Sequence, residues 1–133
     1  MDVRFANSYV EGVFAERDLL KIYHLISVIS DERELPEECW LFNRLLEWMG
    51  STRSGVWQYY EHLPAETYER IIRALERFGL ETVAEQYRSG HSAWAGPDQA
   101  ASVDAWIDAH EEELEDTVFR LIAGRKEVLL EAR

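Results

Sequence analysis

Helical periodicity, interrupted by only three prolines, is the feature that most restricts how this chain of 133 residues can fold. Pro36, Pro64 and Pro97 each precede a stretch in which apolar residues recur every three or four positions. Proline is tolerated in the first turn of a helix because its missing N–H would have no partner there. Nowhere does an alternating apolar and polar run between turn residues predict a strand. The sequence therefore predicts an all-α fold of six to eight helices in a single compact domain, residues 1–133.

The first long helix is expected from Val13 to Ser30, where apolar residues occur all around the helical circumference. This distribution predicts a buried central helix, in which His24 would be a packed core residue. Further helices are predicted over 36–49, shortly after Gly55, over 64–78, over 81–88, and from Asp98 to at least Ala123, with a loop over 89–96.

Apolar residues make up 47% of the chain, which is enough for a hydrophobic core at this length. Five Trp, six Tyr and five Phe argue against disorder, since disordered acidic chains contain few aromatic residues. Cys39 is the single cysteine, so no intramolecular disulfide can form. The first residues lack a signal-peptide pattern, and no apolar run is long enough for a membrane span. These features predict a soluble, cytoplasmic protein.

Negative charge is concentrated between Ser89 and Phe119. These 31 residues include eight acids and no Lys or Arg, so they carry −8 of the formal net charge of −12. Such a charge distribution should repel nucleic acids and anionic membranes and attract basic protein surfaces.

Six of these acids form what we call the acidic stripe. On a continuous helix, four of them fall within an arc of about 60°, and the other two widen it. The stripe consists of Asp104, Asp108, Glu111, Glu112, Glu115 and Asp116. One interpretation is a solvated face near a helix N-terminus, where the helix dipole favours acids. The other is a surface that imitates a DNA backbone, because no Lys or Arg in this stretch offsets the repulsion.

No residue pattern in the chain predicts a chemical reaction. The sequence contains no zinc or di-metal motif, no calcium loop, no phosphate-binding glycine loop and no nucleophile elbow. His110 shares the apolar face of its predicted helix, and Cys39 lies beside Trp40, so both are expected to be packed residues. We therefore predict a protein that is not an enzyme, with no catalytic residues, no metal and no cofactor.

The segment Ser54-Gly55-Val56-Trp57-Gln58-Tyr59-Tyr60-Glu61-His62 resembles the central motif of a bacterial family of small acidic helical proteins. Most of that family is known only as a domain of unknown function, and its named member is a DNA mimic. The matching residues are Gly55, Gln58, Tyr59, Tyr60 and Gly79, the last within Ala74-Leu75-Glu76-Arg77-Phe78-Gly79. Three positions differ from the motif: Arg53 replaces its first asparagine, Ser54 replaces a glycine, and His62 replaces its last asparagine.

The resemblance covers about residues 38–90, and it implies an all-α fold and a homodimer. For the mimic member, it also implies an acidic face that occupies the DNA site of a transcription regulator. The acidic stripe lies outside the matched segment. The matched residues themselves are expected to organise a helix junction, since Gln beside two aromatics can satisfy backbone groups.

The leading hypothesis is a non-enzymatic interaction protein whose acidic stripe binds a basic protein, with a DNA-binding regulator as the natural target. The main alternative is an immunity-type inhibitor of a basic toxin such as a nuclease. A third is a small enzyme that uses the region from Trp57 to His62.

Overall fold

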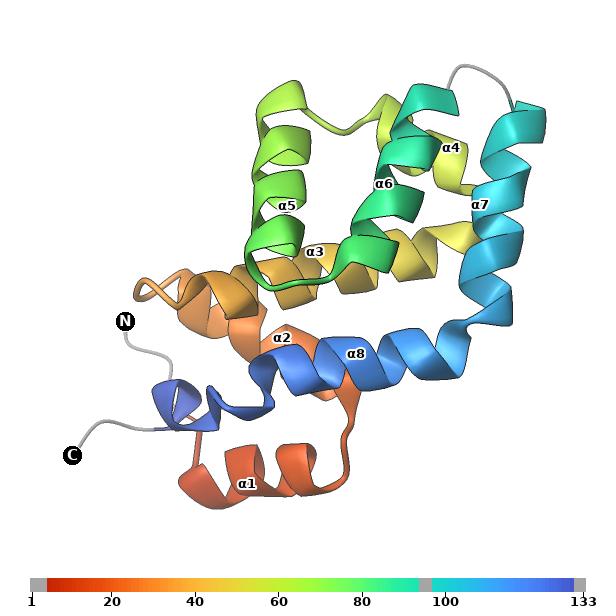
Figure 1. Cartoon of the computed structure of the whole chain (residues 1–133). Helices are drawn as coiled ribbons and strands as arrows, with labels where there is room; N and C mark the ends of the chain where they lie inside the picture. Colours follow the sequence, from red (N-terminus) through yellow and green to blue (C-terminus); the bar gives the residue numbers. More distant parts are fainter. Residues whose placement is uncertain (1–4, 94–96, 131–133) are drawn as a thin grey trace. The chain divides into compact units, whose positions relative to one another are not determined.

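The structure, a computed structural model, describes residues 5–93 and 97–130. In these ranges the chain forms eight α-helices and two short 3-10 helices, with no strand (Figure 1). The elements are α1 Asn7–Ala15, α2 Leu19–Ser30, α3 Glu37–Gly50, η1 Ser51–Arg53, α4 Val56–Glu61, α5 Ala65–Arg77, α6 Glu81–Ala93, α7 Pro97–Ala109, α8 Glu111–Ala123 and η2 Lys126–Leu129. This confirms the all-α prediction of six to eight helices. None of the helices in these ranges has the length and apolarity needed to cross a membrane.

The helices group into two compact units. One contains the chain up to Asn43 together with the chain from Glu115 onward, and the other contains Arg44–Leu114. In the first unit, α1 packs on α2, and η2 contacts both of these helices. In the second, α6 lies between α5 and α7, and α4 contacts α6 and α7 (Figure 1). That residues 1–133 form one domain stays a prediction.

The expected helix over 13–30 is two helices, because the chain turns sharply at Arg17. Arg17 has the left-handed φ of 53°. The N–H groups of Arg17 and Asp18 donate to the carbonyls of Phe14 and Val13, which is the Schellman pattern that ends a helix. Asp18 then caps α2, since its carboxylate accepts from the Lys21 N–H at 3.1 Å. The continuous helix was therefore a wrong prediction.

Helix α2 buries only one face. Ile22, Leu25, Ile26 and Ile29 are buried, whereas Leu20 is 65% exposed. His24 is also exposed, so its predicted role as a core residue is wrong. The helix is therefore amphipathic rather than surrounded by protein.

The acidic C-terminal region is also divided into two helices rather than one from Asp98 to Ala123. The break lies at His110, whose ring Nδ1 lies 2.8 Å from the Trp106 carbonyl oxygen. A carbonyl can only accept, so Nδ1 carries the proton. The His110 carbonyl in turn accepts the N–H of Leu114 at the start of α8. The break places three consecutive glutamates in the first turn of α8, where the helix dipole favours them.

Helix α6 is longer than predicted. It continues to Ala93, so residues 89–93 of the expected loop are helical, and positions 94–96 lie outside the described residues. Gly90 permits this continuation, because a Cβ at that position would lie 2.5 Å from the Tyr60 ring. By contrast, α5 begins after Pro64 and ends before Gly79 as predicted.

Candidate interaction surface

The acidic stripe is distributed over two helices. Asp104 and Asp108 belong to α7, and Glu111, Glu112, Glu115 and Asp116 belong to α8. The arc of about 60° that was predicted for four of these acids assumed one continuous helix, so it does not describe their arrangement on two helices. What each acid can do must be judged from its own surroundings.

Asp104 has a structural task. Its Oδ1 accepts the Val56 N–H at 2.9 Å, at the first residue of α4. The N-cap residue of α4 is Gly55, which has no side chain to cap the helix, so the carboxylate from α7 takes that place. Partial burial raises the pKa of Asp104, the hydrogen bond from Val56 lowers it, and the charge of Asp108 raises it. Asp104 is therefore better described as a cap than as part of an open acidic surface.

Asp116 is neutralised within its own unit by two arginines. Arg17 Nη2 lies 2.8 Å from Asp116 Oδ1, and Arg120 pairs with Oδ2 from one turn further along α8. These hydrogen bonds, from Arg17 first and Arg120 second, lower the pKa of Asp116. Both arginines lie outside the 31-residue stretch without basic residues, and Arg17 is 99 positions away in the sequence.

The remaining four members of the stripe are open to solvent. Asp108, Glu111, Glu112 and Glu115, which we call the acidic quartet, are all exposed. Within residues 5–93 and 97–130, no Lys or Arg forms an ion pair with any of them. Asp108 is notable because it lies in the last turn of α7, where the helix dipole disfavours an acid. Helix stability therefore accounts for Glu111 and Glu112 but not for Asp108.

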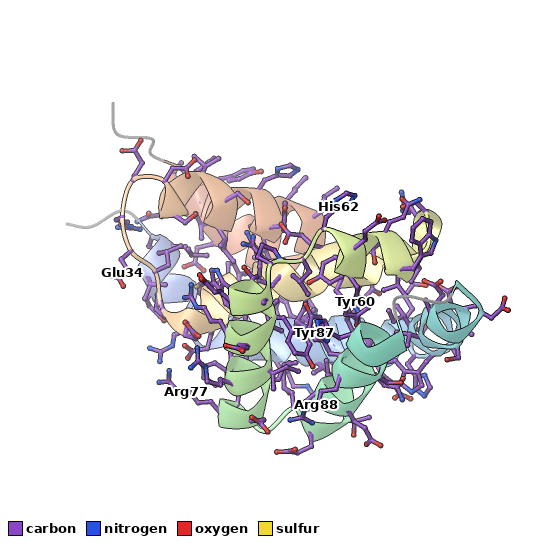
Figure 2. All side chains as sticks on the ribbon, turned by 90° about the horizontal axis from the view of Figure 1, so that it is seen from above. Glu34, Tyr60, His62, Arg77, Tyr87 and Arg88 are labelled. Atoms are coloured by element: carbon purple, nitrogen blue, oxygen red, sulfur yellow. The ribbon has the colours of Figure 1, made fainter. Side chains whose placement is uncertain are left out.

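The two tyrosines of the family-like motif form hydrogen bonds in the interior of the second unit. The Tyr60 hydroxyl accepts from Trp48 Nε1 at 2.9 Å and donates to the Tyr87 carbonyl at 2.9 Å. The hydroxyls of Tyr59 and Tyr87 are 2.5 Å apart. Burial raises the pKa of Tyr59 to about 12, and it also raises the pKa values of Tyr60 and Tyr87. Figure 2 shows Tyr60 and Tyr87 among α4, α5 and α6.

Gln58, another matching residue of that motif, is exposed and therefore does not share the buried network of Tyr59 and Tyr60. The two matching glycines have conformational tasks. Gly55 has a φ of 96° before α4, and Gly79 has a φ of 73° after α5. Only glycine adopts such values readily. Beside Gly79, the Leu80 N–H donates to the Leu75 carbonyl at 2.8 Å, and this hydrogen bond ends α5.

The residues considered for chemistry are not brought together in a cluster. His62 is exposed at the turn after α4 (Figure 2), while the Tyr59 and Tyr60 hydroxyls bond inside the second unit. No group of three or more His, Cys, Asp or Glu suited to a metal occurs among the described residues. Cys39 is fully buried, and burial raises the pKa of its thiol to about 11, as expected for a packed residue. His110 is half-buried and stacks on Trp106 with ring centroids 4.5 Å apart.

A second acidic run escaped the sequence interpretation. Asp31, Glu32 and Glu34 are exposed in the turn between α2 and α3. The density of acids over residues 31–38, five acids with one arginine, was the signal that could have revealed it. Nothing in the sequence indicated the pairing of Arg17 with Asp116, because that contact depends on the tertiary fold.

Comparison with known proteins adds no relative. No protein-family model matches this chain, and no curated protein or solved structure matches it. The resemblance to the DNA-mimic family therefore stays a prediction that depends on the motif residues alone.

Proposed function

We propose that this chain is a non-enzymatic interaction protein whose acidic quartet binds a basic protein surface, with a DNA-binding regulator as the preferred target. The quartet carboxylates would pair with Arg and Lys side chains that otherwise hold phosphates, and the partner would be occupied competitively. In this proposal the chain itself binds neither nucleic acid nor membrane, and it acts as a cytoplasmic protein.

One observation carries the proposal. Asp108 is exposed at the dipole-disfavoured end of α7, and it is followed within eight residues by three more exposed acids that no described arginine or lysine neutralises. Like charges at helical spacing cost stability, and the helix dipole that favours Glu111 and Glu112 does not favour Asp108. Asp104 and Asp116 are not included in the quartet. Asp104 already caps α4, and Asp116 is already paired with Arg17 and Arg120.

The test is capture of partners from native lysate at low salt with three forms of the protein. The first is wild type, and the second carries Asp108→Asn, Glu111→Gln, Glu112→Gln and Glu115→Gln. The third is a matched control with the same charge change at exposed acids elsewhere: Asp31→Asn, Glu32→Gln, Glu34→Gln and Glu85→Gln.

The proposal expects one basic protein to be retained by the wild type and the control and lost with the quartet variant. It also expects retention to decrease steeply as salt is added. Equal capture by the quartet variant would refute the role of the quartet. If both the quartet variant and the matched control fail to retain the partner, binding depends on net charge alone and not on the position of the quartet.

A further inference from the structure

Arg17 places its guanidinium in a site formed by a carboxylate and an aromatic ring of α8. Its Nη2 is 2.8 Å from Asp116 Oδ1, and its guanidinium carbon is 4.4 Å from the centroid of the Phe119 ring. Proteins commonly bind arginine in this way, with a carboxylate for the charge and an aromatic face for the planar cation. Helix α8 therefore has a site for an arginine, and the chain fills it with one of its own.

The backbone conformation at position 17 is one that arginine rarely adopts. Arg17 is the one non-glycine residue of the described chain with a positive φ. A left-handed conformation disfavours residues with a Cβ, and glycine or asparagine usually occupies this position at the end of a helix. Arginine offers the turn no conformational advantage, and what its side chain adds at this position is the pair of contacts with Asp116 and Phe119.

The site adjoins the proposed binding surface, since Asp116 directly follows Glu115 of the acidic quartet in α8. Both Arg17 and Asp116 are partly open to solvent, with side chains 51% and 41% exposed, so an incoming cation can reach them. Arg120 pairs with the other oxygen of Asp116, whereas Arg17 pairs with Oδ1 and lies over the Phe119 ring.

We infer that Arg17 acts as an internal competitor: it occupies the Asp116–Phe119 site that an arginine of the basic partner takes, and the partner must displace it. This inference rests on the proposed function. It adds that the partner residue bound at the Asp116–Phe119 site is an arginine rather than a lysine. The guanidinium of an arginine can lie flat on the Phe119 ring while it pairs with Asp116, whereas a lysine ammonium is a point charge.

The test uses Arg17→Gln and Arg17→Gly, with Lys21→Gln as the matched control. All three remove one positive charge from the same unit, but Lys21 pairs with Asp18 and does not contact Asp116. Arg17→Gly also suits the left-handed backbone, so it retains the fold if Arg17→Gln does not. Binding of a fluorescent oligo-arginine peptide and of an oligo-lysine peptide of equal length is measured for each protein.

Both Arg17 variants should bind oligo-arginine about fivefold more tightly than the Lys21→Gln control, the size expected when one exposed ion pair no longer competes. The gain should be smaller for oligo-lysine, and Asp116→Asn should remove it in the Arg17→Gly background. Equal affinities for the Arg17 variants and the Lys21→Gln control would overturn the inference.

A failure of the proposed function has a different signature. If the quartet variant binds oligo-arginine as tightly as the wild type does, the acidic quartet is not the binding surface. The comparison of the Arg17 variants with the Lys21→Gln control does not depend on that result, so each idea can fail separately.

Discussion

At the scale of single residues, members of one acidic pattern have different tasks. Asp104 caps a helix, Asp116 is paired with two arginines, and Asp108 is exposed where the helix dipole disfavours it. The sequence placed these three in one stripe because spacing reports only the face of an idealised helix. The task of each acid is set by groups distant in the sequence, such as the Val56 N–H and the Arg17 guanidinium, and spacing cannot reveal them.

Replacing Asp104 with alanine should lower the free energy of unfolding by about 1 kcal/mol, because the Val56 N–H loses its acceptor at the start of α4. Asp104→Asn retains an acceptor oxygen and should cost less. Urea unfolding measures both, with Asp108→Ala on the same helix as the control. A loss for Asp108→Ala as large as that for Asp104→Ala would contradict the capping role.

Gly55→Ala should destabilise the protein by about 1–3 kcal/mol. At its φ of 96° a side chain is strained, and the new Cβ would lie 2.9 Å from two atoms of the Trp57 ring. Gly50→Ala is the control, since Gly50 has a φ of −72° and no atom within 4 Å of an added Cβ. That control should be stabilised by about 0.4–1 kcal/mol. Thermal or urea unfolding that ranks the two variants in the opposite order would show that the Gly55 conformation is not required.

At the scale of helices, the sequence predicted those that have conventional end signals and missed two breaks. Pro64 and Gly79 bracket α5, and its bounds were predicted closely. The ends of α1 and α7 carry no such signal, because Arg17 occupies the position usually held by glycine and His110 ends α7 through its ring. The apolar pattern continues through both breaks, so periodicity alone predicted one helix where the chain forms two.

The tyrosines Tyr59, Tyr60 and Tyr87 connect α3, α4 and α6 through hydrogen bonds, and we expect the free energy of unfolding to decrease at alkaline pH. Burial raises the pKa of Tyr59 from 10.0 to about 12 and raises those of Tyr60 and Tyr87 further. The folded state holds these protons more tightly than the unfolded state does. The stability that the protonated tyrosines contribute is therefore fully present below pH 10, which is the pKa of tyrosine in the unfolded chain. It is lost as the pH rises from about 10 to 12 for Tyr59, by about 1.4 kcal/mol per pH unit for each tyrosine.

Urea unfolding between pH 8 and 11 measures this loss, with tyrosinate absorbance as a second readout. Tyr59→Phe should reduce the dependence on pH, since one of the buried hydroxyls is then absent. A free energy of unfolding that stays constant across this range would contradict the burial of these hydroxyls.

At the scale of the whole molecule, the acidic character is divided between structure and surface. Each unit uses part of its charge internally: Arg125 pairs with Glu38 and Lys126 with Glu11 in the first, and Arg88 pairs with Glu76 in the second. The composition describes an acidic, aromatic-rich chain, and helical periodicity predicted the all-α fold that the structure confirms. Which carboxylates remain open could not be predicted, because that depends on which arginines the fold brings near them.

The central claim is that the acidic quartet occupies the place of DNA on a basic partner, and a competition measurement tests it most directly. The captured partner is bound to a fluorescent duplex, and this chain is added at increasing concentration. The account predicts that the wild type releases the duplex, while the quartet variant leaves it bound. A complex in which partner, duplex and chain are all present together would contradict the claim, because competing ligands cannot occupy one surface at the same time.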